Sequence, residues 1–257
     1  MRDERSSLIG TERWPQVAGG PAARSSFYLT APAPCPYLPG QTERKLFTEL
    51  GGARPAEIAE TLGRLGFRRS QNVLYRPACD SCRACVPVRI PVAEFAPSAS
   101  QRRLVRAHAD LAADARPPWT TDEQYALLRR YLGDRHRDGG MSAMDAIDYA
   151  DMVEQTRVDT RVVEYRDAGD ALVGACVTDV QRDGLSMVYS FYEPRHQTRR
   201  GLGTWMILDH ISRARTLGLG YVYLGFWIAG APRMAYKTRF RPLETLTVGG
   251  WARAPVA

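Results

Sequence analysis

Four cysteines have a spacing that suits metal binding. Cys79, Cys82 and Cys85 follow one another with two residues between them, and Cys35 supplies a fourth thiol from further upstream. Two-residue spacing lets neighbouring thiolates turn toward one ion, as in structural zinc and iron–sulfur sites. The alternative is a set of buried apolar cysteines that hold no ligand. Of the two, the spacing favours a structural zinc ion or an iron–sulfur cluster.

A glycine turn is the second feature that could do chemistry. Residues 199–203 read Arg-Arg-Gly-Leu-Gly and stand between a strand-like run and a helical run. Glycines let the backbone approach a phosphate, and the N-terminus of a helix offers it free N–H groups. An ordinary strand-to-helix turn is the alternative for so short a motif. The unit resembles the acyl-transfer core of the GNAT superfamily, but Thr198 stands where members that bind coenzyme A usually have Gln or Arg. This departure argues against coenzyme A as the donor.

Cations and aromatic residues alternate near the carboxy-terminus. Arg233, Tyr236, Lys237 and Arg239 follow Trp227 within a short stretch. Aromatic rings and cations together fit a pocket for a nucleotide end or an acidic substrate. They fit equally well a helix with one packed side and one basic, solvated side.

A basic helix is expected after Ser98 or Ser100, either of which can cap it. Arg102 and Arg106 are four residues apart and share a face, with Arg103 beside them. A solvated charged face is the default reading. Contact with a phosphate backbone is the sharper alternative, because guanidinium groups bind phosphate oxygens in bidentate fashion.

The composition is that of a packed protein with a basic surface. The chain has 257 residues, 44% of them hydrophobic and 25% charged, and a formal net charge of +7 that attracts polyanions. Only two of its 35 cationic residues are lysines, Lys45 and Lys237. No apolar stretch is long enough for a signal peptide or a membrane span, so we expect a cytoplasmic protein that binds no membrane.

The first half is expected to hold mixed short elements. The residue pattern predicts a short helix after Thr42, a second helix that begins at Pro55, and a hairpin over residues 67–76. Residues 86–92 alternate like a strand, and two prolines in this run predict that it lies at a sheet edge.

The second half is expected to combine a meander of strands with helices. Thr121 and Gln124 form a capping-box pattern ahead of one helix, and another helix is expected from Ser142. Trp205 begins the apolar stripe of a helix that follows the glycine turn. The strand-like runs are 160–165, 171–180, 186–192 and 221–227.

Together these elements predict an α+β protein. We expect a GNAT-like acyltransferase domain, with a mixed and largely antiparallel sheet flanked by helices, over residues 113–257. A smaller cysteine-containing domain over residues 26–112 is expected to precede it, behind a flexible amino-terminus over residues 1–25.

Several longer motifs resemble the arginyl-tRNA protein transferase family, most closely its bacterial branch, which donates leucine. The resemblance covers about residues 27–245. Its motifs are Phe27-Tyr28-Leu29, Cys35-Pro36-Tyr37-Leu38-Pro39-Gly40, Tyr75-Arg76-Pro77-Ala78-Cys79, Ser100-Gln101-Arg102-Arg103, Ser190-Phe191-Tyr192-Glu193-Pro194, Tyr223-Leu224-Gly225-Phe226-Trp227-Ile228 and Met234-Ala235-Tyr236-Lys237. Glu193 departs from the family, which tends to have Asp there, and Ala231 lies near a position where the family often has a cysteine.

The resemblance implies an aminoacyltransferase. Such an enzyme transfers leucine from Leu-tRNA to the α-amino group of proteins that begin with Asp or Glu, and thereby marks them for N-degron degradation. The aminoacyl ester is already activated, so positioning and oxyanion stabilisation are expected to dominate without a cofactor. The cysteine cluster is then expected to organise the amino-terminal domain.

The resemblance also assigns roles to residues. Tyr192, Tyr236 and Trp227 are expected to shape the pocket for the aminoacyl-adenosine, and Lys237 and Arg239 to neutralise the acidic side chain of the acceptor. Glu193 either accepts the amine proton or pairs with an arginine. We assign Tyr192, Glu193 and Tyr236 to catalysis; Trp227, Arg233, Lys237 and Arg239 to substrate binding; and Arg102, Arg103, Arg106, Arg199, Arg200, Gly201 and Gly203 to tRNA binding.

Overall fold

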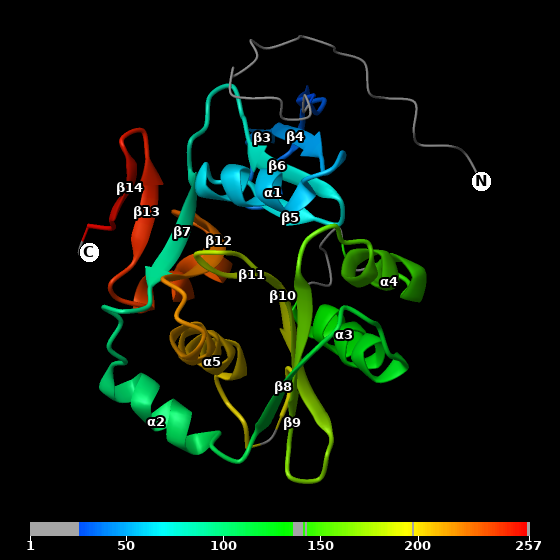
Figure 1. The fold of residues 1–257 in the computed structure, drawn as a ribbon, viewed down its shortest axis with the longest axis vertical. Coiled ribbons are helices and arrows are strands. Elements are labelled where there is room, and N and C mark those ends of the chain that lie inside the picture. Colours follow the sequence, from blue (N-terminus) through cyan, green and yellow to red (C-terminus); the bar gives the residue numbers. More distant parts are fainter. Residues whose placement is uncertain (1–25, 136–140, 142, 197, 256–257) are drawn as a thin grey trace.

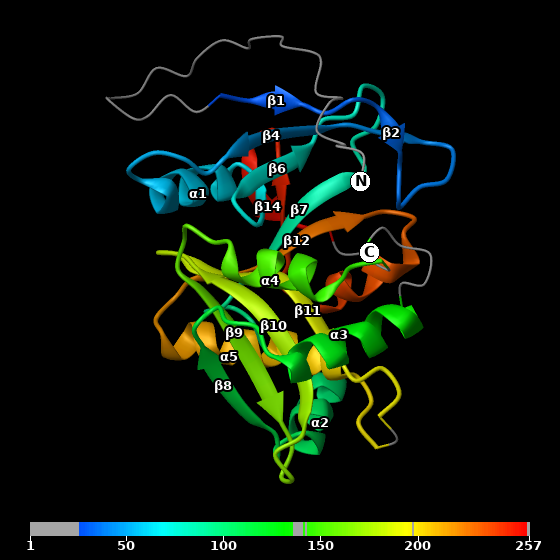
Figure 2. The same cartoon turned by 90° about the vertical axis from the view of Figure 1, so that its right-hand side faces the viewer.

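Two main sheets of different size and one two-stranded sheet form the protein (Figures 1 and 2). The computed structural model describes residues 26–135, 141, 143–196 and 198–255, so the expected flexible amino-terminus lies outside the described residues. The mixture of an extended sheet with flanking helices confirms the predicted α+β class.

The small sheet is built from the first part of the chain. Its strand order is β1-β4-β6-β5, all antiparallel, and helix α1 (Pro55–Arg64) begins at the expected proline and covers the sheet. Leu50, Phe67 and Leu74 are buried between them. The strands are β1 (Tyr28–Leu29), β4 (Lys45–Glu49), β5 (Arg68–Ser70) and β6 (Val73–Pro77), and a short pair, β2 (Ala33–Pro34) with β3 (Thr42–Glu43), lies beside them.

The helix expected after Thr42 is absent, and this prediction is wrong. The segment forms β3 and β4 instead, and β4 pairs with β1 on one side and β6 on the other. Ladder hydrogen bonds to two partners outweigh the helical spacing of the apolar residues in this segment, which is why local pattern misled here. The hairpin expected over residues 67–76 is confirmed by β5 and β6.

The large sheet has eight strands in the order β14-β13-β7-β12-β11-β10-β9-β8. Every neighbouring pair is antiparallel except β11 and β12, which run parallel. The strands are β7 (Cys85–Pro91), β8 (Ala112–Arg116), β9 (Thr160–Arg166), β10 (Leu172–Val180), β11 (Gly184–Tyr192), β12 (Tyr221–Ile228), β13 (Glu244–Thr247) and β14 (Gly250–Arg253).

Strand β7 lies inside the large sheet, so the prediction of an edge strand is wrong. It pairs with β12 along its length but with β13 only at Val88 and Arg89, which are placed between the two prolines. A proline is tolerated where no ladder bond is needed, and the short contact with β13 needs few. The division at residue 112 stays a prediction, and β7 links the segment before it to the sheet of the segment after it.

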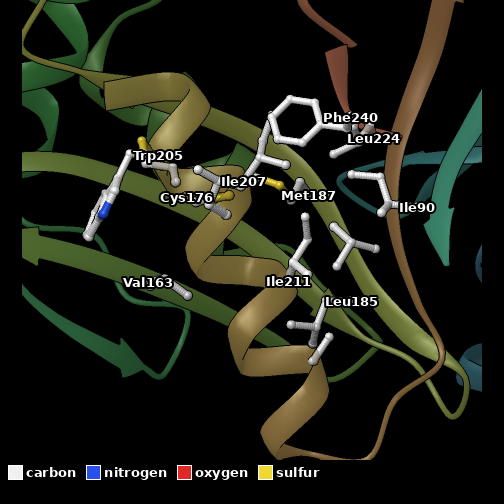
Figure 3. Close-up of a cluster of buried hydrophobic side chains, with 14 of the residues drawn as sticks. Ile90, Val163, Cys176, Leu185, Met187, Trp205, Ile207, Ile211, Leu224 and Phe240 are labelled. Atoms are coloured by element: carbon white, nitrogen blue, oxygen red, sulfur yellow. The ribbon is translucent and has the colours of Figure 1, made fainter. Parts of the chain in front are cut away.

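Helices cover both faces of the large sheet (Figure 1). On one face, α5 (Leu202–Thr216) and α2 (Ala99–Ala107) pack over a core that contains Trp205, Ile211 and Cys176, as Figure 3 shows for the α5 side chains. On the other face lie α3 (Asp122–Arg135) and α4 (Ala146–Glu154). Val162 and Val163 face opposite cores, as the alternation of a strand requires.

Capping fixes where these helices begin. Ser98 and Gln101 form a reciprocal capping box at α2, and Thr121 and Gln124 exchange the same two bonds at α3, as predicted. Helix α4 is capped by Asp145, and the start expected at Ser142 lies outside the described residues.

Candidate functional site

The parallel strands β11 and β12 pair over a short distance and then part. Their register runs over only three residues each, Gly184–Ser186 with Tyr221–Tyr223. Beyond this point β11 has an extra residue, Val188, relative to β10, and β12 has an extra residue, Leu224, relative to β7. Two bulges therefore stand at the place where the sheet opens, and bulges commonly accompany functional sites because they break the ladder and redirect side chains.

Arg68 of the small sheet occupies the point where the strands part. Its Nη2 donates to the carbonyls of Met187 and Val188 on β11, at 2.8 and 3.0 Å. On β12, Gly225 has a φ of +75°, and a Cβ built there would lie 1.0 Å from Nη1 of Arg68. Only glycine leaves room for this guanidinium. Sequence analysis missed Arg68, and a glycine inside a strand was the signal of a close approach that could have pointed to it.

Lys237 is buried beside this point. It lies on the 3₁₀ helix η2 (Pro232–Arg239), is only 4% exposed, and donates from Nζ to the carbonyl of Phe226 on β12. Burial lowers the pKa of Lys237 to about 7, and the nearby charge of Arg68 contributes to this shift. The amine thus gives up its proton more readily than an ordinary lysine.

The other cations expected to bind the substrate do not share the buried environment of Lys237. Arg233 and Arg239 are exposed, whereas Lys237 is turned into the protein. The backbone of Arg239 is anchored by Gln101, which donates to its carbonyl at 3.2 Å. The structure therefore does not bring Lys237 and Arg239 together, and Arg68 is the cation next to Lys237.

The three aromatic residues expected to line the pocket lie on β11, β12 and η2. The ring of Tyr192 packs on Gly203, where a Cβ would lie 2.8 Å from Cε1, and stacks edge-on with Tyr131 at 5.1 Å. Tyr236 is within electrostatic range of both Arg68 and Tyr192. Trp227 is half-buried against the core that α5 covers.

Glu193 is an ion-pair partner in this structure. Its carboxylate accepts from Nε of Arg130 on α3 at 2.7 Å, and its own backbone N–H donates to Val173 at 2.9 Å. Of the two alternatives from the sequence, a proton acceptor and a partner of an arginine, the second is the arrangement that the structure shows.

Helix α2 supports the glycine turn. Gly201 caps α5 with a φ of +76° and lies against Leu104 of α2. The ring of His108 is hydrogen-bonded to the carbonyl of Arg200 at 3.0 Å. Arg199 forms a two-fold ion pair with Asp110 that lowers the pKa of that carboxyl to about 2.

The arginines expected to bind tRNA differ in their exposure and in whether they already have an ion-pair partner. Arg102, Arg103 and Arg106 on α2 are exposed, and so is Arg200. Arg102 also donates to the carbonyl of Pro97 at 2.6 Å. Arg199 is already occupied by its ion pair, so the exposed arginines are the ones able to reach a phosphate.

The four cysteines gather in the small sheet region as free thiols. Burial raises the pKa of Cys85 to about 11, and Cys35, Cys79 and Cys82 all add to this shift, which places these three thiols within electrostatic range of Cys85. Among the described residues, no group of three or more His, Cys, Asp or Glu side chains has a geometry that could hold a metal ion. We derive no chemical step through a metal.

Family models match the two parts of the chain. The model described as arginine-tRNA-protein transferase, N terminus, matches residues 33–103, and the one described as arginine-tRNA-protein transferase, C terminus, matches residues 123–247. The chain belongs to the arginine-tRNA-protein transferase family. Family membership makes it an aminoacyltransferase and confirms the resemblance seen in the sequence.

Curated relatives within this family match most of the chain. An aspartate/glutamate leucyltransferase of Rhizorhabdus wittichii is 60% identical over 232 residues, which cover 88% of this chain and 87% of the relative. One of the same name from Sphingopyxis alaskensis is also 60% identical, over 88% of this chain and 90% of its own length.

A solved structure, L-PGS from Bacillus licheniformis, has 12% identity and a TM-score of 0.45 over 57% of this chain and 48% of its own. In the part of the chain that the structure describes, no helix is long and apolar enough to cross a membrane.

Proposed function

We propose that this transferase moves leucine from Leu-tRNA to the α-amino group of proteins that begin with Asp or Glu, and so marks them for N-degron degradation. The observation that carries the proposal is the 60% identity, over nearly the full length of both chains, to relatives named aspartate/glutamate leucyltransferase. We place the reaction in the cytoplasm, where charged tRNA is present.

In the proposed reaction, the neutral α-amine of the acceptor attacks the ester carbonyl of the aminoacyl-tRNA. The new amide bond forms as the bond between carbonyl carbon and ribose oxygen breaks, and the ribose hydroxyl takes up the proton that the amine loses. An α-amine with a pKa near 8 is partly neutral at cellular pH. The ester is already activated, so the reaction needs positioning more than strong base catalysis and no cofactor.

The donor is proposed to bind along the face that carries α2 and the glycine turn. Exposed Arg102, Arg103 and Arg106 are suited to the phosphate backbone, and Arg200, Gly201 and Gly203 to phosphates near the charged end. Tyr192, Tyr236 and Trp227 are proposed to receive the adenosine and its amino acid. Glu193, through Arg130, is proposed to hold the end of β11 against α3.

The cysteine cluster is proposed to organise the small sheet region, as a structural zinc or iron–sulfur site or as packed thiols. The proximity of the four thiols supports a shared structural role. Zinc and iron analysis of the purified protein, with Cys82→Ser as comparison, distinguishes the two forms.

A transfer assay tests the proposed function. The protein is incubated with radiolabelled Leu-tRNA or Arg-tRNA and with peptides that begin with Asp, Glu, Lys or Ala. We expect label on the Asp and Glu peptides, and only from Leu-tRNA. Labelling from Arg-tRNA alone would show that arginine, and not leucine, is the donated amino acid. Equal labelling of all four peptides would contradict the proposed selection of acceptors that begin with Asp or Glu.

A further inference from the structure

Arg68 and Lys237 contact consecutive residues of β12 at the point where the large sheet opens. Arg68 packs on Gly225, and Lys237 donates to the carbonyl of Phe226. Among the described residues, neither side chain has a carboxylate partner. We propose that Arg68 and Lys237 together bind the side-chain carboxylate of the acceptor's first residue, so that a residue of the small sheet determines acceptor specificity. This inference rests on the proposed function.

The charges at this place favour an anion. Two cations lie close together, one of them almost fully buried, and among the residues that the structure describes only backbone carbonyls accept from them. Buried charges are normally paired, because removal from water is costly without a counter-charge. Elsewhere in this protein the rule holds: buried Arg69, the next residue, is paired with Asp179. The missing counter-charge at Arg68 and Lys237 points to a ligand that brings one.

The geometry of Arg68 suits a carboxylate. Within the described part of the chain, both carbonyl bonds of Arg68 come from Nη2, which leaves Nη1 and Nε as donors. Nη1 is the atom that lies over Gly225, on the side of β12 and Lys237. A guanidinium donates to carboxylate oxygens in a fixed fork, and an ammonium adds a second, adjustable donor. The pair therefore offers both directional and purely electrostatic recognition.

The position also suits the reaction. In Asp and Glu the carboxylate is only a few bonds from the α-amine, so a held carboxylate fixes where the amine lies. Tyr236 is within electrostatic range of Arg68 on one side and of Tyr192 on the other. An acidic first residue held by Arg68 would thus present its amine beside the aromatic residues proposed for the aminoacyl end.

A purely structural role for Arg68 makes a different prediction. Arg68 also ties β5 to β11, so its loss could loosen the site for every acceptor. Such loosening lowers transfer to neutral and acidic acceptors alike. A recognition role lowers transfer to acidic acceptors alone, so the ratio between matched peptides separates the two roles.

The experiment compares peptides that differ only in charge. The full chain and its variants transfer labelled leucine to peptides beginning with Asp or Asn, and with Glu or Gln, and kcat/KM is measured for each. We expect the wild type to favour Asp over Asn by about ten- to a hundredfold, as for a charge-assisted hydrogen bond. Arg68→Gln is expected to bring Asp down to the level of Asn with Asn changed less than about threefold, and Arg68→Lys to keep part of the preference.

Control variants test the choice of residues. Arg76→Gln changes an exposed arginine on neighbouring β6 and is expected to keep the full preference. Arg239→Gln tests the exposed arginine favoured by sequence alone. Equal loss on Asp and Asn peptides in Arg68→Gln, or loss of the preference in Arg239→Gln but not in Arg68→Gln, overturns the proposal.

A binding measurement separates this inference from the donor assignment. Fluorescence anisotropy of carboxy-terminally labelled Asp and Asn peptides is measured without tRNA. Tighter binding of the Asp peptide to the wild type, lost in Arg68→Gln, supports the pair even if leucine proves not to be the donated amino acid. Equal binding of both peptides by the wild type contradicts the pair, whatever the donor.

Discussion

Tyr192 and Gly203 are in direct contact, and the contact leaves no room for a side chain at position 203. A Cβ there would lie 2.8 Å from Cε1 of the tyrosine and 3.3 Å from Cζ. The last residue of β11 and the first turn of α5 therefore fix each other's positions.

We expect Gly203→Ala to move the Tyr192 ring and lower kcat/KM for transfer by about ten- to a hundredfold, because small displacements of positioning groups are costly. Steady-state transfer assays measure the effect. Gly133→Ala in α3 is the matched control, since a Cβ there meets no atom within 4 Å and alanine favours helix. Full activity in Gly203→Ala would show that the position of the ring is unimportant.

The buried ion pair between Arg69 and Asp179 joins the two sheets. Nε and Nη2 of Arg69 each donate to Asp179 at 2.6 Å, and Thr160 donates to the same carboxylate at 2.8 Å. Asp179→Asn or Arg69→Met is expected to reduce the free energy of unfolding by about 3–5 kcal/mol, because one buried charge loses its partner. Urea denaturation measures this. Arg54→Gln, in an exposed pair with Glu57, is the control and should change it by under about 1 kcal/mol.

The lowered pKa of Lys237 makes stability depend on pH. The unfolded chain holds this proton up to about pH 10.5 and the folded protein only up to about 7. Between these values the unfolded state binds more protons, so the contribution of Lys237 to stability rises with pH. The wild type should gain stability from pH 6.5 to 9.5 relative to Lys237→Met, as measured by urea midpoints at each pH. Parallel pH curves for the two proteins would rule out a perturbed lysine.

The ion pair of Glu193 with Arg130 gives a matched pair of variants. If Glu193 acts only by holding β11 against α3, Glu193→Gln and Arg130→Gln should lower kcat to a similar and small extent, under about fivefold. A general base contributes about 10²–10⁴-fold. A loss of that size in Glu193→Gln, with Arg130→Gln nearly intact, would assign the proton transfer to Glu193.

The exposed arginines of α2 predict a change in salt dependence. Each of Arg102, Arg103 and Arg106 that meets a phosphate should, when changed to Gln, reduce the slope of log Kobs against log salt by about 0.7–0.9. Titration of labelled tRNA at several salt concentrations measures the slope. Arg161→Gln on β9 is the control. An unchanged slope in the triple variant would place the tRNA elsewhere.

Local pattern predicted much of the carboxy-terminal half. The strands from Thr160 to Tyr192, the glycine turn and the stripe of Trp205 on α5 lie where the sequence predicts them, because alternation and helical periodicity act over a few residues. The capping boxes at Ser98 and Thr121 are equally local.

Contacts between residues far apart in the sequence explain the predictions that are wrong or absent. Thr42 begins β3 rather than a helix because partners on other segments complete the small sheets, and the site role of Arg68 depends on carbonyls 119 and 120 residues away. Lys237 and Arg239 were grouped because they are near in sequence, yet η2 turns one inward and the other outward. The spacing of two residues in the sequence does not determine which way their side chains point in a 3₁₀ helix that packs on a strand.

Strand β7 has a consequence for how the chain is made. It is synthesised early, but its neighbours in the sheet, β12 (Tyr221–Ile228) and β13 (Glu244–Thr247), come much later in the chain. Until these residues emerge from the ribosome, β7 has two unpaired edges of the kind that invite aggregation. Strand β7 therefore waits for its partners after the small sheet is complete, and a nascent chain that stalls before Tyr221 would carry an open strand for chaperones to shield.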